Sequence, residues 1–276
     1  GNTSTVVVGG NLVVGGTGNV QFQTGAGILN FTVKGNVIKN GTGDFRLHTY
    51  GSASAGNDVI FNIDGNLTVN DGFFVLSTAS ASGTSETINL KGNLQKLLAG
   101  YMTQSNSSGF ANSSFNFTGT STQTVDVIVQ NTNDMLRYRF FVKSGAYVQI
   151  IDQDWRFATD SRLTVEDGGT LDFGFNGTTA LNLTETTSSA TTLFALNQKG
   201  TLKITSPLGI TTTAGAFGNV QLDSRTYDQV ATFHYIGKTN QVTGNGITTG
   251  SSAKIIICDL IDNATQLSFT NSTGIT

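Results

Sequence analysis

A five-residue motif, apolar–any–Gly–Asn–apolar, recurs four times in the first hundred residues of the chain. Its glycines are Gly10, Gly35, Gly65 and Gly92, which are 25, 30 and 27 residues apart. Self-similarity at this spacing is typical of solenoid proteins, in which each repeat forms one turn of a stack. Because one such unit cannot bury its apolar face alone, the motif predicts coils that share a core with their neighbours.

The residues around the motif predict β-strands. Apolar side chains occupy every second position, as with Phe61 and Ile63 before Gly65 and with Leu67 and Val69 after it. A period of two is typical of a strand with one buried face. We expect each motif glycine to bend the chain at a corner with a positive φ, and the asparagine beside it to bond its own backbone.

The repeat continues through the rest of the chain in a changed form. Gly-bearing turns and alternating apolar residues mark further units at residues 115–129, 163–174, 199–210 and 217–247. Helical periodicity is almost absent, and we interpret Leu94–Met102 as a variant coil. The predicted fold class is all-β: one continuous right-handed parallel β-helix over residues 1–276, a β-solenoid of about ten coils, with a possible subdivision near residue 130. Neither end shows a polar cap, so we expect a piece of a longer protein.

Composition excludes several classes of function. Charged residues make up 12% and the net charge is −3, which argues against nucleic acid, since that partner needs a basic face. The single cysteine, Cys258, excludes an intrachain disulfide and a thiolate metal cluster. The longest apolar runs are too short for a transmembrane segment, which takes about 20 residues.

Several strings resemble a known group of proteins: GNLTVNDGFF, FTGTSTQTV, EDGGTLDFG, GTLKITSPLGI and YDQVATFHYIGKTNQVTGNGI. They are similar to the repetitive regions of very large surface proteins of Bacteroidetes-type bacteria, including gliding-motility adhesins and haemagglutinin-like molecules. Many of those proteins leave the cell by the type IX secretion system. The resemblance implies a β-helical rod outside the cell, associated with the outer membrane, whose partners are secretion or surface-anchoring machinery and a glycan or other surface ligand. It carries over no catalytic residue and no cofactor.

Candidate metal sites are weak. The turns Gly15–Asn19 and Asn40–Asp44 resemble calcium-binding nonapeptide turns, but the spacing does not repeat every nine residues, so we interpret them as glycine-rich corners. His48 and His234 have no second ligand at a useful spacing. We therefore predict no metal site.

Candidate catalytic carboxylates are also few. Asp152 and Asp154 are two residues apart and could share one strand face as an acid/base pair. The segment Asn131–Asp134 superficially resembles a pectinase motif, although the other elements of that family are absent. We interpret these carboxylates as turn residues and predict that the chain is not an enzyme.

The segment Met135–Phe157 has the most unusual composition and contains the only tryptophan. Every second residue of this segment is expected to face outward, which predicts a basic strip with one exposed ring: Arg137, Arg139, Phe141 and Lys143. Trp155 of the following coil is expected to lie near this strip. Arginine forks and aromatic rings suit a glycan ligand. The alternative, which we favour, is that the aromatic residues fill a wider coil and the arginine stems cover it.

These observations predict a non-enzymatic segment of a large exported surface protein, acting as an adhesin or a stiff spacer. The second hypothesis is a polysaccharide-binding or polysaccharide-degrading β-helix centred on Met135–Phe157.

Overall fold

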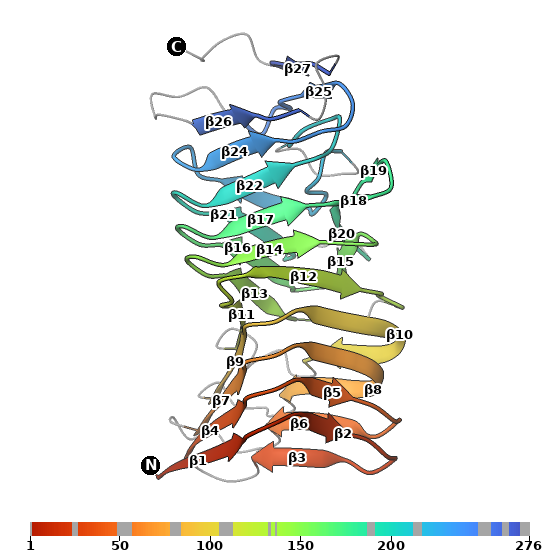
Figure 1. Ribbon diagram of the computed structural model, residues 1–276, viewed down its shortest axis with the longest axis vertical. Coiled ribbons are helices and arrows are strands. Elements are labelled where there is room, and N and C mark those ends of the chain that lie inside the picture. Colours follow the sequence, from red (N-terminus) through yellow and green to blue (C-terminus); the bar gives the residue numbers. More distant parts are fainter. Residues whose placement is uncertain are drawn as a thin grey trace.

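The computed structural model is an elongated stack of β coils, with the strands labelled β1 and β27 at opposite ends of the stack (Figure 1). It describes residues 2–23, 27–48, 57–77, 84–104, 113–131, 134–135, 137–186, 191–211, 217–247, 255–260 and 265–270. All regular elements in these ranges are strands, and the long sheets pair in parallel. The predicted parallel β-solenoid is therefore confirmed, with a coil number close to the expected ten.

One long sheet takes one strand from each successive coil. In spatial order its nine strands are β1 (Thr3–Val8), β4 (Ile28–Val33), β7 (Asn57–Ile63), β9 (Thr84–Leu90), β11 (Ser114–Phe117), β13 (Arg139–Val142), β16 (Arg162–Val165), β21 (Leu193–Leu196) and β23 (Ser224–Tyr227). Each strand of a coil thus completes the hydrogen bonds of the coil below it.

The second long sheet has twelve strands. Its main path is β2 (Leu12–Val14), β5 (Val37–Lys39), β8 (Leu67–Ser77), β10 (Leu94–Thr103), β12 (Thr122–Val127), β14 (Tyr147–Ile150), β17 (Thr170–Phe173), β22 (Thr201–Ile204), β24 (Thr232–Tyr235) and β26 (Ile255–Cys258), and β3 (Val20–Gln23) and β6 (Asp44–His48) pair beside it, β6 with β8. The segment Leu94–Met102 is strand, as predicted, and its register shifts between Lys96 and Ala99.

Short strands close the coils on their remaining side. The parallel pairs are β15 (Trp155–Phe157) with β20 (Leu183–Glu185), and β25 (Gln241–Val242) with β27 (Leu267–Ser268). One hairpin interrupts this pattern, β18 (Phe175–Asn176) with β19 (Thr179–Ala180), and it is the single antiparallel pairing among the described strands. Figure 1 shows it projecting from the side of the stack.

Inward side chains form columns along the axis. One column in the nine-stranded sheet runs through Phe31, Phe61, Ile88, Phe115, Phe140, Leu163 and Phe194. All of them are buried, and burying each such side chain contributes about 1.5–3 kcal/mol to stability. The period-two pattern of the sequence therefore corresponds to one continuous core shared by all coils.

The repeated Gly–Asn corner forms a ladder of its own. The side-chain Oδ1 atoms of Asn11, Asn36 and Asn66 each accept a hydrogen bond of 2.8 Å from the backbone N–H of the next asparagine in the series, which ends at Asn93. The N–H groups of Gly35, Gly65 and Gly92 each donate to the motif glycine carbonyl one coil below, at 3.1 Å. The asparagine is therefore needed to link neighbouring coils rather than to bond its own turn.

The predicted positive φ at these glycines is wrong. The left-handed glycines of the chain lie elsewhere, for example at Gly41 and Gly72. At Gly65 the restriction is space, because an added Cβ would lie 2.5 Å from the Asn36 Oδ1 atom and 2.7 Å from the Gly35 carbonyl oxygen. The motif requires glycine because the coils approach closely at this corner.

Candidate functional site

The predicted basic strip lies on the outer face of the nine-stranded sheet. Arg139 and Phe141 alternate along β13 with the buried Phe140 and Val142. The Phe141 ring lies near two cations, with the Arg139 Cζ atom 5.7 Å and the Lys143 Nζ atom 4.9 Å from the ring centroid. The strip therefore presents one aromatic ring between two positive groups.

Most charges in the strip already have partners. Lys143 forms an ion pair with Glu166 at 2.7 Å, and Arg137 with Asp160 at 3.5 Å. Arg139 lies directly beside Arg162 of the next coil, and partial burial followed by this like charge lowers the pKa of Arg139. These contacts link successive coils, so the strip has a structural role whether or not it binds a ligand.

Trp155 does not belong to this strip. It is only 1% exposed and packs in the core, with its ring centroid 4.9 Å from that of Phe140, 5.2 Å from Phe157 and 6.1 Å from Phe117. Its predicted place in a ligand platform is wrong because β15 starts a new alternation after the turn at Asp152, which puts Trp155 inward. For this residue the alternative interpretation, aromatic core filling, describes the structure.

The two carboxylates weighed as an acid/base pair do not share a strand face. Asp152 has a positive φ of 65° in the turn between β14 and β15. The Asp154 Oδ1 atom accepts a 2.8 Å hydrogen bond from the backbone N–H of Asn182 in the next coil. Both residues therefore serve turn geometry, as the turn interpretation predicted.

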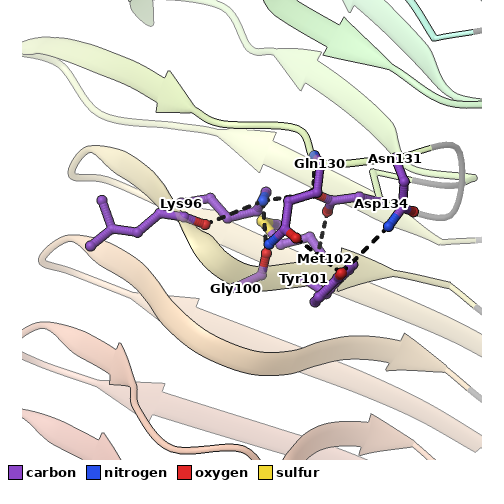
Figure 2. Close-up of polar contacts among 8 residues, drawn as sticks. Lys96, Gly100, Tyr101, Met102, Gln130, Asn131 and Asp134 are labelled. Atoms are coloured by element: carbon purple, nitrogen blue, oxygen red, sulfur yellow. Dashed lines mark hydrogen bonds and ion pairs between the residues drawn. The ribbon is translucent and has the colours of Figure 1, made fainter.

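The Asn131–Asp134 segment contributes a buried ion pair instead of a catalytic group. The structure describes its two end residues, and the Asp134 Oδ2 atom lies 2.7 Å from the Lys96 Nζ atom, with both side chains fully buried (Figure 2). The Asp134 carboxylate also accepts hydrogen bonds from the backbone N–H groups of Met102 and Gln130, each at 3.1 Å. Lys96 donates in addition to the Gly100 carbonyl at 2.8 Å (Figure 2).

Sequence reasoning missed this pair, although the strand parity contained a signal. One inward column of the second sheet reads Val14, Lys39, Val69, Lys96, Val127. Lys39 donates to the backbone carbonyls of Asn40, Gly41 and Asp71, at 3.0, 2.7 and 3.0 Å. Burial lowers the pKa of both lysines, and the Asp134 carboxylate opposes that effect at Lys96. Each ammonium thus donates hydrogen bonds to backbone carbonyl groups that point into the core.

A second buried polar cluster surrounds His48. Its Nδ1 atom lies 2.9 Å from the Glu86 Oε1 atom, and Ser113 donates a hydrogen bond to the Glu86 Oε2 atom. All three side chains are buried, so His48 is a core residue with a carboxylate partner rather than an isolated strand residue. Within the described ranges, no group of three or more His, Cys, Asp or Glu side chains gathers as a metal site would require.

The outer face of the twelve-stranded sheet carries a third polar network. The Tyr147 hydroxyl donates to the Asp172 Oδ2 atom, and the Lys203 Nζ atom donates to the Tyr147 hydroxyl oxygen at 2.9 Å. Burial, more than any other factor, raises the pKa of Asp172. The pKa of Tyr147 is also raised, mainly by burial and secondly by the hydrogen bond to Asp172. The network joins three coils, and Tyr147 and Asp172 keep their protons to higher pH than usual.

A pocket of about 290 Å³ opens beside the β18–β19 hairpin. Phe175 and Thr179 line it from the hairpin, Pro207 and Leu208 from the following coil, and Lys238 from the coil after that. The Lys238 Nζ atom donates to the Gly177 carbonyl at 2.7 Å. Of the features described so far, this one departs furthest from the regular coil.

Comparisons with known proteins identify no family for this chain. No family model matches the chain, and no curated protein matches it. A solved structure, the crystal structure of a TibC-catalysed, hyper-glycosylated fragment of TibA, is 12% identical and aligns over 99% of both chains with a TM-score of 0.23. A similarity this weak carries no argument about function. Among the described residues, no helix is long and apolar enough to cross a membrane.

Proposed function

We propose that this chain is a non-enzymatic segment of an extracellular cell-surface protein, in which it acts as a stiff rod that spaces or presents an adhesive surface. The observation that carries the proposal is the unbroken parallel ladder along the axis, from β1 to β23 in one sheet and from β2 to β26 in the other. Hydrogen bonds between every pair of neighbouring coils resist bending and stretching together.

The arrangement of charges supports a mechanical role over catalysis. The Lys96–Asp134 pair and the Tyr147–Asp172–Lys203 network join neighbouring coils through short polar contacts. The residues nearest to a catalytic pair in sequence, Asp152 and Asp154, lie in a turn. These groups stabilise the stack rather than facing an open cleft.

Single-molecule pulling between the two ends of the chain tests the rod. A parallel solenoid is expected to unravel coil by coil, each step releasing roughly 90–110 Å of chain for a coil of 27–30 residues. The Asn66→Ala variant lacks one hydrogen bond of the asparagine ladder. In the same experiment, the coils joined at that position are expected to unfold at a lower force. Extension at low force without coil-sized steps would contradict the mechanical role.

The resemblance to gliding adhesins and haemagglutinin-like proteins supports export by a type IX-like route, with secretion and surface-anchoring machinery as partners. Labelling intact cells with an antibody raised against this segment tests the location. Signal on intact cells that disappears in a secretion-deficient strain is expected. Signal that appears only after the cells are broken would place the segment inside.

Glycan binding by the basic strip is the second candidate function, favoured by the half-buried Phe141 ring between two cations. A glycan array with the parent chain and with Arg139→Ala and Phe141→Ala variants tests it. Trp155 is not a useful probe of this site because it lies in the core. An array without any bound glycan eliminates the strip as a binding surface.

A further inference from the structure

The pocket beside the hairpin is assembled from three consecutive coils. The β18–β19 hairpin follows β17, the residues Thr205–Leu208 follow β22 in the next coil, and Lys238 follows β24 in the coil after that. The contact from the Lys238 ammonium to the Gly177 carbonyl therefore reaches across the middle coil and roofs over its turn. Antiparallel pairing occurs at this place in the described chain and not in its regular ladders.

The floor of the pocket is held by one buried amide. Asn219 is fully buried, and its Oδ1 atom accepts hydrogen bonds from the backbone N–H groups of Thr205 and Ser206, at 2.9 and 2.8 Å. Its Nδ2 atom donates to the Leu181 carbonyl and to the Thr205 hydroxyl, at 2.8 and 2.9 Å. These bonds tie the floor residues to the neighbouring coil, so the cavity is a fixed part of the fold.

The lining combines apolar surface with hydroxyl and amide groups. Phe175, Pro207 and Leu208 supply apolar surface, and Thr179, Asn182 and Gln221 supply hydroxyl and amide groups. Among the described residues that line the pocket there is one charged side chain, Lys238, and no carboxylate. Its Nζ atom lies 4.3 Å from the Phe175 ring centroid and uses one of its three donors on Gly177. Two ammonium donors remain for a ligand.

We propose that this pocket binds a single acidic sugar residue, a hydroxylated ring that carries one carboxylate. The volume lies at the low end of the range for small-molecule sites, which suits a ligand of that size. The apolar side chains can pack against the ring, the hydroxyl and amide groups can exchange hydrogen bonds with its hydroxyls, and Lys238 attracts its carboxylate. An adhesive role for the site rests on the proposed function, whereas binding itself does not.

Calorimetric titration of the full chain with methyl glucuronide, methyl glucoside and acetate tests the site. Methyl glucuronide is expected to bind, with methyl glucoside at least about tenfold weaker because it lacks the charge that Lys238 recognises. Acetate alone is expected not to bind, since it lacks the ring. Lys238→Gln and Phe175→Ala are each expected to weaken glucuronide binding at least about tenfold.

Matched controls replace a lysine and a ring that lie outside both the pocket and the basic strip. Lys91→Gln and Phe73→Ala change exposed side chains of the earlier coils, and are expected to leave glucuronide binding unchanged. Thermal unfolding of each variant shows whether it is folded, and Lys238→Gln changes an exposed residue. Three results each overturn the proposal: no glucuronide binding, equal binding of glucoside or acetate, or glucuronide binding that survives Lys238→Gln. None of these three results changes the outcome expected from the pulling experiment, so the pocket proposal and the proposed mechanical function are tested independently.

Discussion

At the scale of single residues, charged side chains stabilise the interior of this stack. Lys39 and Lys96 occupy core positions where other coils have valine, and their ammonium groups bond carbonyls of the turn. Removing one member of a buried pair leaves an uncompensated charge, which costs more than the pair contributed. The interior therefore depends on both members of the Lys96–Asp134 pair.

The Lys96→Met variant tests this dependence. We expect it to lower the free energy of unfolding by about 3–5 kcal/mol, because Asp134 then stays buried without its cation. Lys143→Met is the matched control, since it breaks a partly exposed ion pair and should cost less than about 1 kcal/mol. Urea unfolding followed by the fluorescence of the single tryptophan measures both. Equal losses in the two variants would contradict the structural role of the buried pair.

The position of Trp155 gives a second prediction. We expect Trp155→Ala to lose about 3–5 kcal/mol, as is usual when a buried aromatic side chain is truncated in a core. Circular dichroism during urea unfolding measures the loss without needing tryptophan fluorescence. Arg156→Ala changes the exposed neighbour on the same strand and should have little effect.

The sequence indicated which positions face inward more reliably than what they contact there. Strand parity placed Phe140 and Val142 in the core and Arg139 outside, as the structure has them. Lys39 and Lys96 share the parity of the inward valines but went unpredicted, because lysine is usually a surface residue and their oxygen partners come from turns that parity does not describe. Trp155 was misplaced because a turn of unknown length resets the alternation.

At the scale of elements, the Gly–Asn corner sets how closely coils can stack. Sequence alone predicted a corner at each motif but attributed glycine to backbone conformation. The requirement comes from the coil below, since Gly35, Gly65 and Gly92 each sit against an asparagine oxygen of the previous repeat. A contact between repeats cannot be inferred from one repeat, which is why the position of the corner was predictable and its cause was not.

Two alanine substitutions at the same motif position distinguish these causes. Gly65→Ala is expected to destabilise the chain by about 1–3 kcal/mol, because its Cβ would overlap the backbone of the lower coil. At Gly10 no atom lies within 4 Å of an added Cβ, so Gly10→Ala should change stability by less than about 0.5 kcal/mol. Thermal unfolding of both variants makes the comparison. A large loss at both positions would show that backbone conformation, and not space, requires glycine.

At the scale of the whole molecule, buried tyrosines couple stability to alkaline pH. Burial raises the pKa of Tyr138, Tyr227 and Tyr235 above the ordinary value of about 10. Above that pH the unfolded chain releases protons that the folded chain retains, so the free energy of unfolding falls as pH rises. Lys39 and Lys96, whose pKa is lowered, instead make the free energy of unfolding rise with pH, but only up to about pH 10.5.

We therefore expect the urea midpoint to be lower at about pH 11.5 than at about pH 9, with tyrosinate absorbance appearing as the chain unfolds. Tyr235→Phe should reduce this pH dependence, since it removes one of the tyrosine protons that the folded chain retains, although it also removes a 2.8 Å hydrogen bond to the Thr243 carbonyl. Complete tyrosine titration in the folded chain would show that these hydroxyls are not buried.

The overall architecture followed from the sequence because repetition amplifies a weak signal: each coil restates the same alternation. The pocket did not, because the β18–β19 hairpin occurs once in the described chain and its roof comes from a lysine two coils away. A feature that occurs once in a repetitive chain leaves no repeated signal in the sequence, so the repeat pattern does not predict it.

The asparagine ladder has a consequence for how such a chain can change in length. Asn36 and Asn66 present the same Oδ1 acceptor to the repeat above, and both are followed by an apolar residue that donates to the next asparagine carbonyl. Excising residues 37–66 would join Asn36 directly to Leu67 and leave a corner with the same chemistry. Genes for such proteins can therefore gain or lose whole turns by recombination within the motif, and the length of the stack can evolve without redesign of its interior.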